Sequence, residues 1–257
     1  MNRRPKFTEI PRPYVASIVQ ERSIEASVAN IMNSEHDGAA GFMVDLSYLK
    51  PEDRNDENMK RLFSSTKKPI MSLLYRSGYM ADDSYTDEDR ANEMLRLTEN
   101  GIVSFDVPGY LFEKDAKREL AQSEEAIEKQ KEFIEKIHAK GGEVLISSHM
   151  AEVLSGEEVL AHLREQQSRG ADIAKIITLC NTEEELLESI RTLILLKREM
   201  EIPYIFLCNG ALGRLQRWFA PVLGSMLTFG VNRYNEISQG VQPTVSAARE
   251  ILREMLI

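Results

Sequence analysis

The sequence is poor in several features that would define whole classes of protein. Its 257 residues contain only two cysteines, Cys180 and Cys208, so we expect buried thiols in a reducing compartment rather than a disulfide framework. No run of eighteen apolar residues occurs, which argues against a membrane span, and the basic, proline-broken start has no apolar stretch typical of a signal peptide. These absences predict a cytoplasmic protein.

Positive charge is also in the minority. The chain has 32 lysines and arginines against 41 aspartates and glutamates, a net charge of −9, and an acidic chain repels phosphate backbones. Nucleic acid is therefore not an expected partner. The sequence has neither G-x-G-x-x-G after its first predicted strand nor G-x-x-x-x-G-K-[ST] anywhere, and no histidines and carboxylates have metal-ligand spacing. We expect no metal and no nucleotide cofactor.

Short apolar runs alternate with longer amphipathic stretches along the whole chain. The runs are four to seven residues long and show little alternation of polar and apolar residues, which is typical of strands covered on both faces. The predicted strands are Tyr14–Val19, Gly41–Leu46, Pro69–Tyr75, Ile102–Val107, Glu143–Ser147, Ile173–Leu179, Pro203–Cys208 and Ser225–Phe229.

Helical patterns lie between these strands. Residues 123–140 carry isoleucines and a phenylalanine at helical spacing and end in a glycine pair. Ser155 with Glu158, and Thr182 with Glu185, have the spacing of capping boxes that open further helices. Eight strand–helix units form either a closed barrel or an open doubly wound sheet. The count of eight and the missing nucleotide motifs favour a single (β/α)₈ TIM barrel over residues 1–257.

In such a barrel the active site lies at the C-terminal ends of the strands. Lys175 lies within the sixth predicted strand, and His149 follows the fifth. The other polar residues expected at this end follow or close the remaining strands: Asp45, Arg76, Asp106, Arg214, Ser238 and Gln242.

Lys175 is the most informative of these residues. An ammonium inside an apolar strand must lose its hydration, which is costly, and desolvation together with neighbouring cations would lower the pKa of the amine. A neutral lysine is the nucleophile that Schiff-base chemistry on a ketone requires. The plainer interpretation is a lysine whose charged end reaches outward between the helices.

The remaining candidates each have a functional and a structural interpretation. His149 has the chemistry of a general acid and base near neutral pH, or it is a hydrogen-bonded structural histidine. Arg76 and Arg214 could hold a carboxylate by paired hydrogen bonds, or they form surface ion pairs. The segment from Ser238 to Gln242 is either a mobile lid or a plain connecting loop.

Five motifs in this order and spacing resemble type I 3-dehydroquinate dehydratase. They are Glu-Val-Leu-Ile-Ser-Ser-His149, Ala-Asp-Ile-Ala-Lys175-Ile, Gly-Ala-Leu-Gly-Arg214-Leu, Gly224-Ser-Met-Leu-Thr-Phe-Gly230 and Ser238-x-x-x-Gln242. Leu-Leu-Tyr-Arg76-Ser adds one match in the N-terminal half, where the resemblance is weaker.

The resemblance implies a dehydration through a covalent imine. Lys175 would attack the C3 ketone of 3-dehydroquinate, and His149 would move the protons. Arg214, Ser238 and Gln242 would bind the carboxylate end of this small keto acid. The iminium stores the electrons, so no metal or organic cofactor is needed. The same resemblance implies a shikimate-pathway enzyme, and we expect a homodimer.

The chain also departs from the family pattern at three positions. The family usually has a glutamate that pairs with the histidine four residues after the arginine matching Arg76, and here that residue is Met80. Asp82 or Asp83 could replace it. The family's Glu-x-Arg on the second strand is here Met43 and Asp45. Asp45 either forms an ion pair with Arg76, which would make the substitution a structural change only, or accepts a hydrogen bond from a donor group of the substrate.

These observations leave three functions open. The first is ordinary 3-dehydroquinate dehydratase activity, and the second is a divergent Schiff-base lyase or aldolase acting on a related keto acid. The third is a non-catalytic protein that has kept the barrel. The retained Lys175 and His149 argue against the third, because a buried lysine without a role is destabilising.

Overall fold

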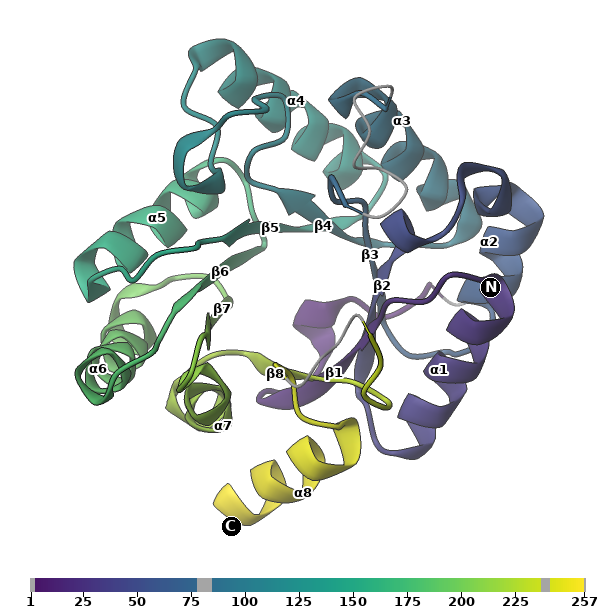
Figure 1. The fold of residues 1–257 in the computed structure, drawn as a ribbon. Coiled ribbons are helices and arrows are strands. Elements are labelled where there is room, and N and C mark those ends of the chain that lie inside the picture. Colours follow the sequence, from purple (N-terminus) through teal and green to yellow (C-terminus); the bar gives the residue numbers. More distant parts are fainter. Residues whose placement is uncertain (1–2, 78–84, 237–240, 257) are drawn as a thin grey trace.

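The computed structural model describes residues 3–77, 85–236 and 241–256, and it has eight parallel strands surrounded by helices (Figure 1). The predicted (β/α)₈ barrel is therefore confirmed. The strands are β1 (Tyr14–Val19), β2 (Gly41–Asp45), β3 (Ile70–Leu73), β4 (Ser104–Pro108), β5 (Glu143–His149), β6 (Ile173–Leu179), β7 (Tyr204–Asn209) and β8 (Leu227–Gly230).

The strands pair in chain order around the barrel. The order is β7-β6-β5-β4-β3-β2-β1-β8, so β1 pairs with both β2 and β8. The junction between β7 and β8 carries a backbone hydrogen bond from Met226 N to Tyr204 O, 2.8 Å long. Two predicted strands, β1 and β6, have the predicted bounds residue for residue, and the other six differ by one to a few residues at their ends.

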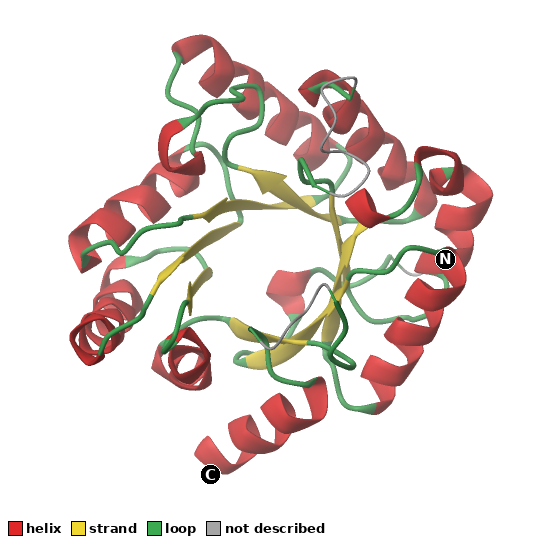
Figure 2. Cartoon of the chain, viewed as in Figure 1, coloured by secondary structure: helices red, strands yellow, loops and turns green. Residues whose placement is uncertain are grey.

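An outer ring of helices covers the barrel (Figure 2). The predicted capping boxes are present at Ser155 with Glu158 and at Thr182 with Glu185. In the part of the chain that the structure describes, no helix is long and apolar enough to cross a membrane. The helices are α1 (Ile24–His36), α2 (Asp56–Phe63), α3 (Asp87–Leu97), α4 (Glu124–Ala139), α5 (Gly156–Ser168), α6 (Glu183–Glu199), α7 (Gly213–Leu223) and α8 (Val245–Met255).

The N-terminal segment closes the barrel at the end where the strands begin. Phe7 is fully buried, and its backbone N–H donates to the carboxylate of Glu143, the first residue of β5. The same carboxylate accepts hydrogen bonds from Thr8 N (3.2 Å) and from the hydroxyl of Ser104. The N-terminal segment therefore covers the start of β5, at the end of the barrel opposite to the C-terminal ends of the strands.

Candidate active site

A cavity of about 240 Å³ opens at the C-terminal ends of the strands. Its walls come from the ends of β1, β3, β5, β6, β7 and β8, together with α7 and the segment that follows β8. The side chains that line it include Lys175 and His149, and the others are Ile18, Gln20, Leu73, Tyr75, Ile177, Asn209, Arg217, Phe229, Val241 and Gln242.

A larger cavity of about 500 Å³ lies at the opposite end, where β7 and β8 begin. Arg12, Lys197 and Tyr204 line it, and most of its remaining wall is apolar. Active sites of (β/α)₈ barrels lie at the C-terminal ends of the strands, and the smaller cavity is the one that holds a buried lysine beside a histidine. We therefore take the smaller cavity as the candidate active site.

The side chain of Lys175 points into the barrel, not outward between the helices. Its Nζ lies 3.0 Å from Asp106 Oδ2, and the two side chains are 4% and 0% exposed. The ring of Phe229 lies 5.5 Å from Nζ, measured to its centroid, and covers the cation from one side. The nearest charged group is thus a carboxylate, whereas the sequence analysis expected neighbouring cations.

Two hydroxyl groups complete the surroundings of this ion pair. Tyr75 donates to Asp106 Oδ2 at 2.7 Å and accepts from Lys175 Nζ at 3.1 Å. Ser147 donates to the other oxygen of Asp106. Burial, and then the charge of Asp106, raise the pKa of Tyr75 well above its usual value, so this phenol stays protonated and acts as a donor.

The backbone of Lys175 is held by a helix side chain. Gln166 of α5 accepts from Lys175 N at 2.9 Å and donates to Lys175 O at 3.0 Å. The same amide donates to the hydroxyl of Ser148 at 3.2 Å. Because Gln166 is fully buried, these bonds fix the strand segment from which the lysine side chain enters the barrel.

His149 closes β5 at the rim of the cavity, where its side chain is 39% exposed. The ring of Tyr75 meets the imidazole edge-on, with 5.3 Å between the centroids. Partial desolvation at the rim of the cavity, and then the charge of Lys175, lower the pKa of His149 below its usual value, while Glu119 and Asp106 act in the opposite direction. The imidazole is therefore neutral at neutral pH and can accept a proton.

Glu119 lies beside this histidine. Its Oε2 accepts from the backbone N–H of His149 at 2.6 Å and lies 3.6 Å from the ring atom Nδ1. Glu119 comes from the connection between β4 and α4, a part of the chain to which the sequence analysis assigned no role.

The arginine in the wall of the cavity is Arg217, not Arg214. Arg217 lies in α7, is 3% exposed, and donates from Nε to Cys208 O and from Nη2 to Asn209 Oδ1, both at 2.8 Å. Its Nη1 is buried and has no hydrogen-bond partner among the described residues. Burial lowers the pKa of Arg217 to about 10, so the guanidinium remains charged at neutral pH.

Arg214 has a different environment. It lies in the first turn of α7, not in a loop, and its guanidinium is exposed and donates to Tyr234 Oη at 2.6 Å. The structure therefore does not bring Arg214 to the cavity. An unpaired N–H of a buried guanidinium, as at Arg217, is the group that a ligand carboxylate would satisfy.

Arg76 and Asp45 do not pair with each other. Arg76 forms an ion pair with Asp87 and stacks 4.6 Å above the ring of Tyr110. Asp45 is 2% exposed and accepts from Ser47 N at 3.1 Å and from Gln20 Nε2 at 3.2 Å. The expected Asp45–Arg76 pair is thus wrong, because neutral donors that follow the ends of β1 and β2 satisfy the carboxylate.

Neither Asp45 nor Arg76 is among the described residues that line the cavity. Burial raises the pKa of Asp45, although its hydrogen bonds to Ser47 and Gln20 oppose the shift. Gln242 does line the cavity, as the sequence predicted. Ser238, Met80, Asp82 and Asp83 lie outside the described residues.

The cavity therefore combines a buried amine, a neutral imidazole and a cation with a free N–H. These groups can attack a carbonyl carbon, accept a proton from a neighbouring atom and hold an anion. Within the described residues, no three histidine, cysteine or carboxylate side chains gather as metal ligands would.

The fold and the cavity place the chain among the (β/α)₈ barrels that carry a lysine inside a strand. A family model described as type I 3-dehydroquinase matches residues 42–257, which is most of the chain. The chain therefore belongs to the type I 3-dehydroquinase family.

Curated relatives match over a shorter region. The 3-dehydroquinate dehydratase of Alkaliphilus oremlandii is 31% identical over 94 residues, 36% of this chain and 37% of that protein. The enzyme of the same name from Geobacillus kaustophilus is 32% identical over 96 residues, 37% of each chain. These alignments thus span little more than a third of the length of the relatives.

Solved structures match the whole barrel. The 3-dehydroquinate dehydratase of Geobacillus kaustophilus superposes with a TM-score of 0.80 at 16% identity, covering 98% of this chain and 96% of that one. The type I enzyme of Clostridium difficile, solved with covalently modified comenic acid, gives 0.79 at 18% identity, covering 99% and 98%. At these identities the similarity shows the shared fold.

The buried ion pair leads to a prediction about stability. Asp106→Asn keeps the shape of the side chain but leaves the Lys175 ammonium without a counter-charge. Removing one partner of a buried pair typically costs about 3–5 kcal/mol, so we expect a loss of this size in the free energy of unfolding, measured by urea denaturation. The control is the double variant Asp106→Asn/Lys175→Met, which should lose less than Asp106→Asn alone. Equal midpoints for Asp106→Asn and the unmodified chain would contradict the prediction.

Proposed function

We propose that this chain is a hydro-lyase that dehydrates 3-dehydroquinate to 3-dehydroshikimate through an imine on Lys175. The observation that carries the proposal is the buried Lys175 amine in the same cavity as His149 and the free N–H of Arg217. Membership of the type I 3-dehydroquinase family supports this choice of substrate. A divergent lyase acting on another keto acid has less support, because Asp45 is not among the described residues that line the cavity and already accepts from Ser47 and Gln20.

Imine formation uses the ion pair. Asp106, 3.0 Å from Nζ, accepts the ammonium proton as the amine attacks the C3 ketone. The carbinolamine then loses its hydroxyl as water, with a proton returned by the neighbouring acids, and a protonated imine remains. One ammonium and one ketone thus give one iminium and one water, with no net change in protons.

Elimination uses the histidine. Neutral His149 takes a proton from the carbon alpha to the imine, and the electrons of that C–H bond move into the iminium to give an enamine. The resulting imidazolium delivers the proton to the hydroxyl group beta to the imine, which leaves as water. Water then hydrolyses the conjugated imine and regenerates Lys175, so the overall products are 3-dehydroshikimate and one water.

Arg217 is our candidate for binding the substrate carboxylate, together with Gln242, which lines the same cavity. Nη1 of Arg217 lacks a protein partner among the described residues, and a charged hydrogen bond there would orient the ring. Arg214, for which the sequence analysis proposed this role, is exposed and bound to Tyr234. Ser238 stays a proposal from the family resemblance, since it lies outside the described residues.

We also propose that residues 1–257 act as one cytoplasmic barrel domain that forms a homodimer in the shikimate pathway. Cys180 and Cys208 are buried free thiols, which agrees with a reducing compartment. The mass of the purified chain in light scattering, compared with 29.3 kDa for one copy, tests the dimer.

The first prediction from this mechanism concerns the covalent intermediate. Borohydride reduction in the presence of 3-dehydroquinate should leave a mass increment on the peptide that contains Lys175, and Lys175→Ala should abolish it because Lys175 is the one lysine among the described residues that line the cavity. Lys197→Ala, which removes a lysine from the cavity at the opposite end, is the control and should trap normally. Trapping by Lys175→Ala at the unmodified level would disprove the assignment.

The second prediction concerns the proton carrier. His149→Ala should lower kcat by about 10²–10⁴-fold, the usual contribution of a general acid–base group, while the imine still forms. In the unmodified enzyme kcat/KM should fall as the pH drops through the pKa of His149. Because that pKa is lowered, the fall should come below pH 6.5. His36→Ala is the control, and a loss of less than several-fold in His149→Ala would exclude the role.

The third prediction separates the two arginines. Arg217→Gln should raise KM for 3-dehydroquinate by about 10- to 100-fold, since a charged hydrogen bond contributes about 1.5–3 kcal/mol. Arg214→Gln should leave KM within about twofold, because the exposed side chain does not reach the cavity. Steady-state kinetics on both variants measures this, and the reverse ranking would return the carboxylate site to Arg214.

A further inference from the structure

The connection between β4 and α4, residues 109–123, carries an unusual backbone beside His149. It contains fifteen residues and includes one short 3-10 turn, Lys117–Glu119. Arg118 and Glu119 follow each other with φ of 55° and 48°. Consecutive residues with side chains rarely adopt this left-handed conformation, which is unfavourable for both and clusters at functional sites.

These two residues direct opposite charges to different places. Arg118 forms ion pairs with Glu152, just before α5 (3.1 Å), and with Glu158, in the first turn of α5 (2.8 Å). Glu119 turns to the other side, where its Oε2 contacts His149. The cation is therefore neutralised away from the cavity, and the carboxylate is left facing the imidazole.

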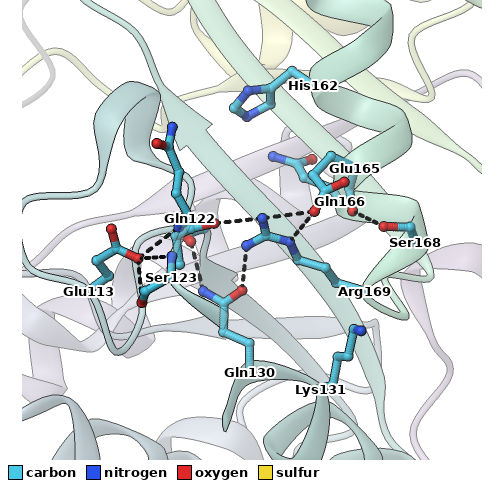
Figure 3. A network of polar contacts seen from close by, with 12 residues as sticks. Glu113, Gln122, Ser123, Gln130, Lys131, His162, Glu165, Gln166, Ser168 and Arg169 are labelled. Carbon is cyan, nitrogen blue, oxygen red and sulfur yellow. Dashed lines mark hydrogen bonds and ion pairs between the residues drawn. The ribbon is translucent and has the colours of Figure 1, made fainter. Parts of the chain in front are cut away.

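Both ends of residues 109–123 are anchored by a polar network with Gln130 of α4 and with Arg169, which directly follows α5 (Figure 3). Gln130 of α4 donates to Gly109 O at 2.7 Å, and Arg169 donates to Ala121 O at 2.6 Å and to Gln130 Oε1 at 2.9 Å. Near the end of the segment, Glu113 accepts from Ser123 N at 2.9 Å. Because these groups are largely buried or part of a connected network, the segment is held firmly against β5.

Close backbone packing fixes Glu119 itself. Its carbonyl oxygen accepts from the hydroxyl of Ser148 at 2.9 Å, one residue before His149. A Cβ on Gly109 would lie 2.4 Å from this same carbonyl and 2.9 Å from Ser148 Oγ, so only glycine permits the approach. The position of Glu119 relative to His149 is thus determined by the backbone on both sides.

We infer that Glu119 is a positioning residue for His149, a carboxylate supplied by the β4–α4 connection that orients the imidazole and stabilises its protonated form during the reaction. Among the described residues, it is the one carboxylate within 4.0 Å of a ring nitrogen of His149. With Nδ1 directed at Glu119, the other ring nitrogen is left to accept the substrate proton.

The distance from Nδ1 to Oε2 is 3.6 Å, which is longer than a hydrogen bond. The contact is therefore electrostatic in this state, and a positive charge on the ring would strengthen it. Two other charged groups act on His149, namely Lys175 from β6 and Asp106 from β4, and the uncharged ring of Tyr75 packs on it. Of these charges, that of Glu119 is the one that can be removed without disturbing the lysine ion pair.

The inference rests on the proposed dehydratase function, but one of its tests does not. Glu119→Gln keeps the side-chain size and the backbone contact and removes the charge. NMR titration of the histidine ring should give a lower pKa for His149 in Glu119→Gln than in the unmodified chain, because the imidazolium has lost a nearby anion. Glu152→Gln is the matched control, since it removes a carboxylate bound to the adjacent Arg118 and should leave the pKa of His149 unchanged.

Kinetics provides the second readout. With 3-dehydroquinate, Glu119→Gln should lower kcat by about tenfold or more with KM within about twofold, and move the acid limb of kcat/KM to lower pH. Glu119→Asp should recover part of kcat, and Gly109→Ala, which displaces the Glu119 backbone, should lower kcat as Glu119→Gln does. Glu152→Gln should retain full activity.

The outcomes separate the two ideas. If the unmodified chain does not turn over 3-dehydroquinate, the proposed function fails, and a lowered pKa of His149 in Glu119→Gln still supports the contact. If the unmodified chain is active but Glu119→Gln matches it in both kcat and the pKa of His149, the inference about Glu119 is overturned. A loss of kcat without any change in the pKa or the acid limb would also overturn it, because that pattern is expected of a structural defect alone.

Discussion

The ion pair between Lys175 and Asp106 is the constraint on which the rest of the cavity depends. An ammonium and a carboxylate that are 4% and 0% exposed lose most of their hydration, and their mutual attraction offsets this only when the remaining donors and acceptors are also satisfied. Asp106 therefore needs the hydroxyls of Tyr75 and Ser147. These requirements fix polar residues on β4, β5 and the end of β3, and they leave apolar side chains such as Phe229 to cover the cation.

The sequence predicted the framework better than the details of the cavity. The strand holding Lys175 was predicted residue for residue, because a fully covered strand is a short apolar run with clear ends. Arg217 was missed because the residue at which the helix after β7 begins, and hence which of its side chains face inward, was not predicted. A helix beginning at Gly213 buries positions 213, 216, 217, 220 and 221, the spacing of one helical face, and this phase puts Arg217 inside and Arg214 outside.

Other contacts at the site have no local pattern in the sequence that would predict them. Glu119 reaches His149 from thirty residues away through two left-handed residues in a segment without periodicity, so neither hydrophobic pattern nor turn chemistry indicates the contact. The Asp45–Arg76 pairing failed for a related reason. Opposite charges near the ends of neighbouring strands make an ion pair plausible. In the structure, however, Arg76 forms its ion pair with Asp87 on α3, and Asp45 accepts hydrogen bonds from Gln20 and Ser47. Such choices among partners depend on three-dimensional distances that the sequence does not express.

The charges around the cavity also bear on which ligand it suits. Lys175 and Asp106 cancel each other, and His149 is neutral because its pKa is lowered. Asp45 is held by Ser47 and Gln20 and is not among the described residues that line the cavity, so it forms no pair with the guanidinium of Arg217. Glu119 lies at the rim against His149, so among the described residues that line the cavity Arg217 is the cation with no carboxylate paired to it, and its Nη1 has no hydrogen-bond partner. A ligand with a single carboxylate and an otherwise uncharged ring would neutralise that charge, whereas a neutral ketone would leave the buried guanidinium unsatisfied.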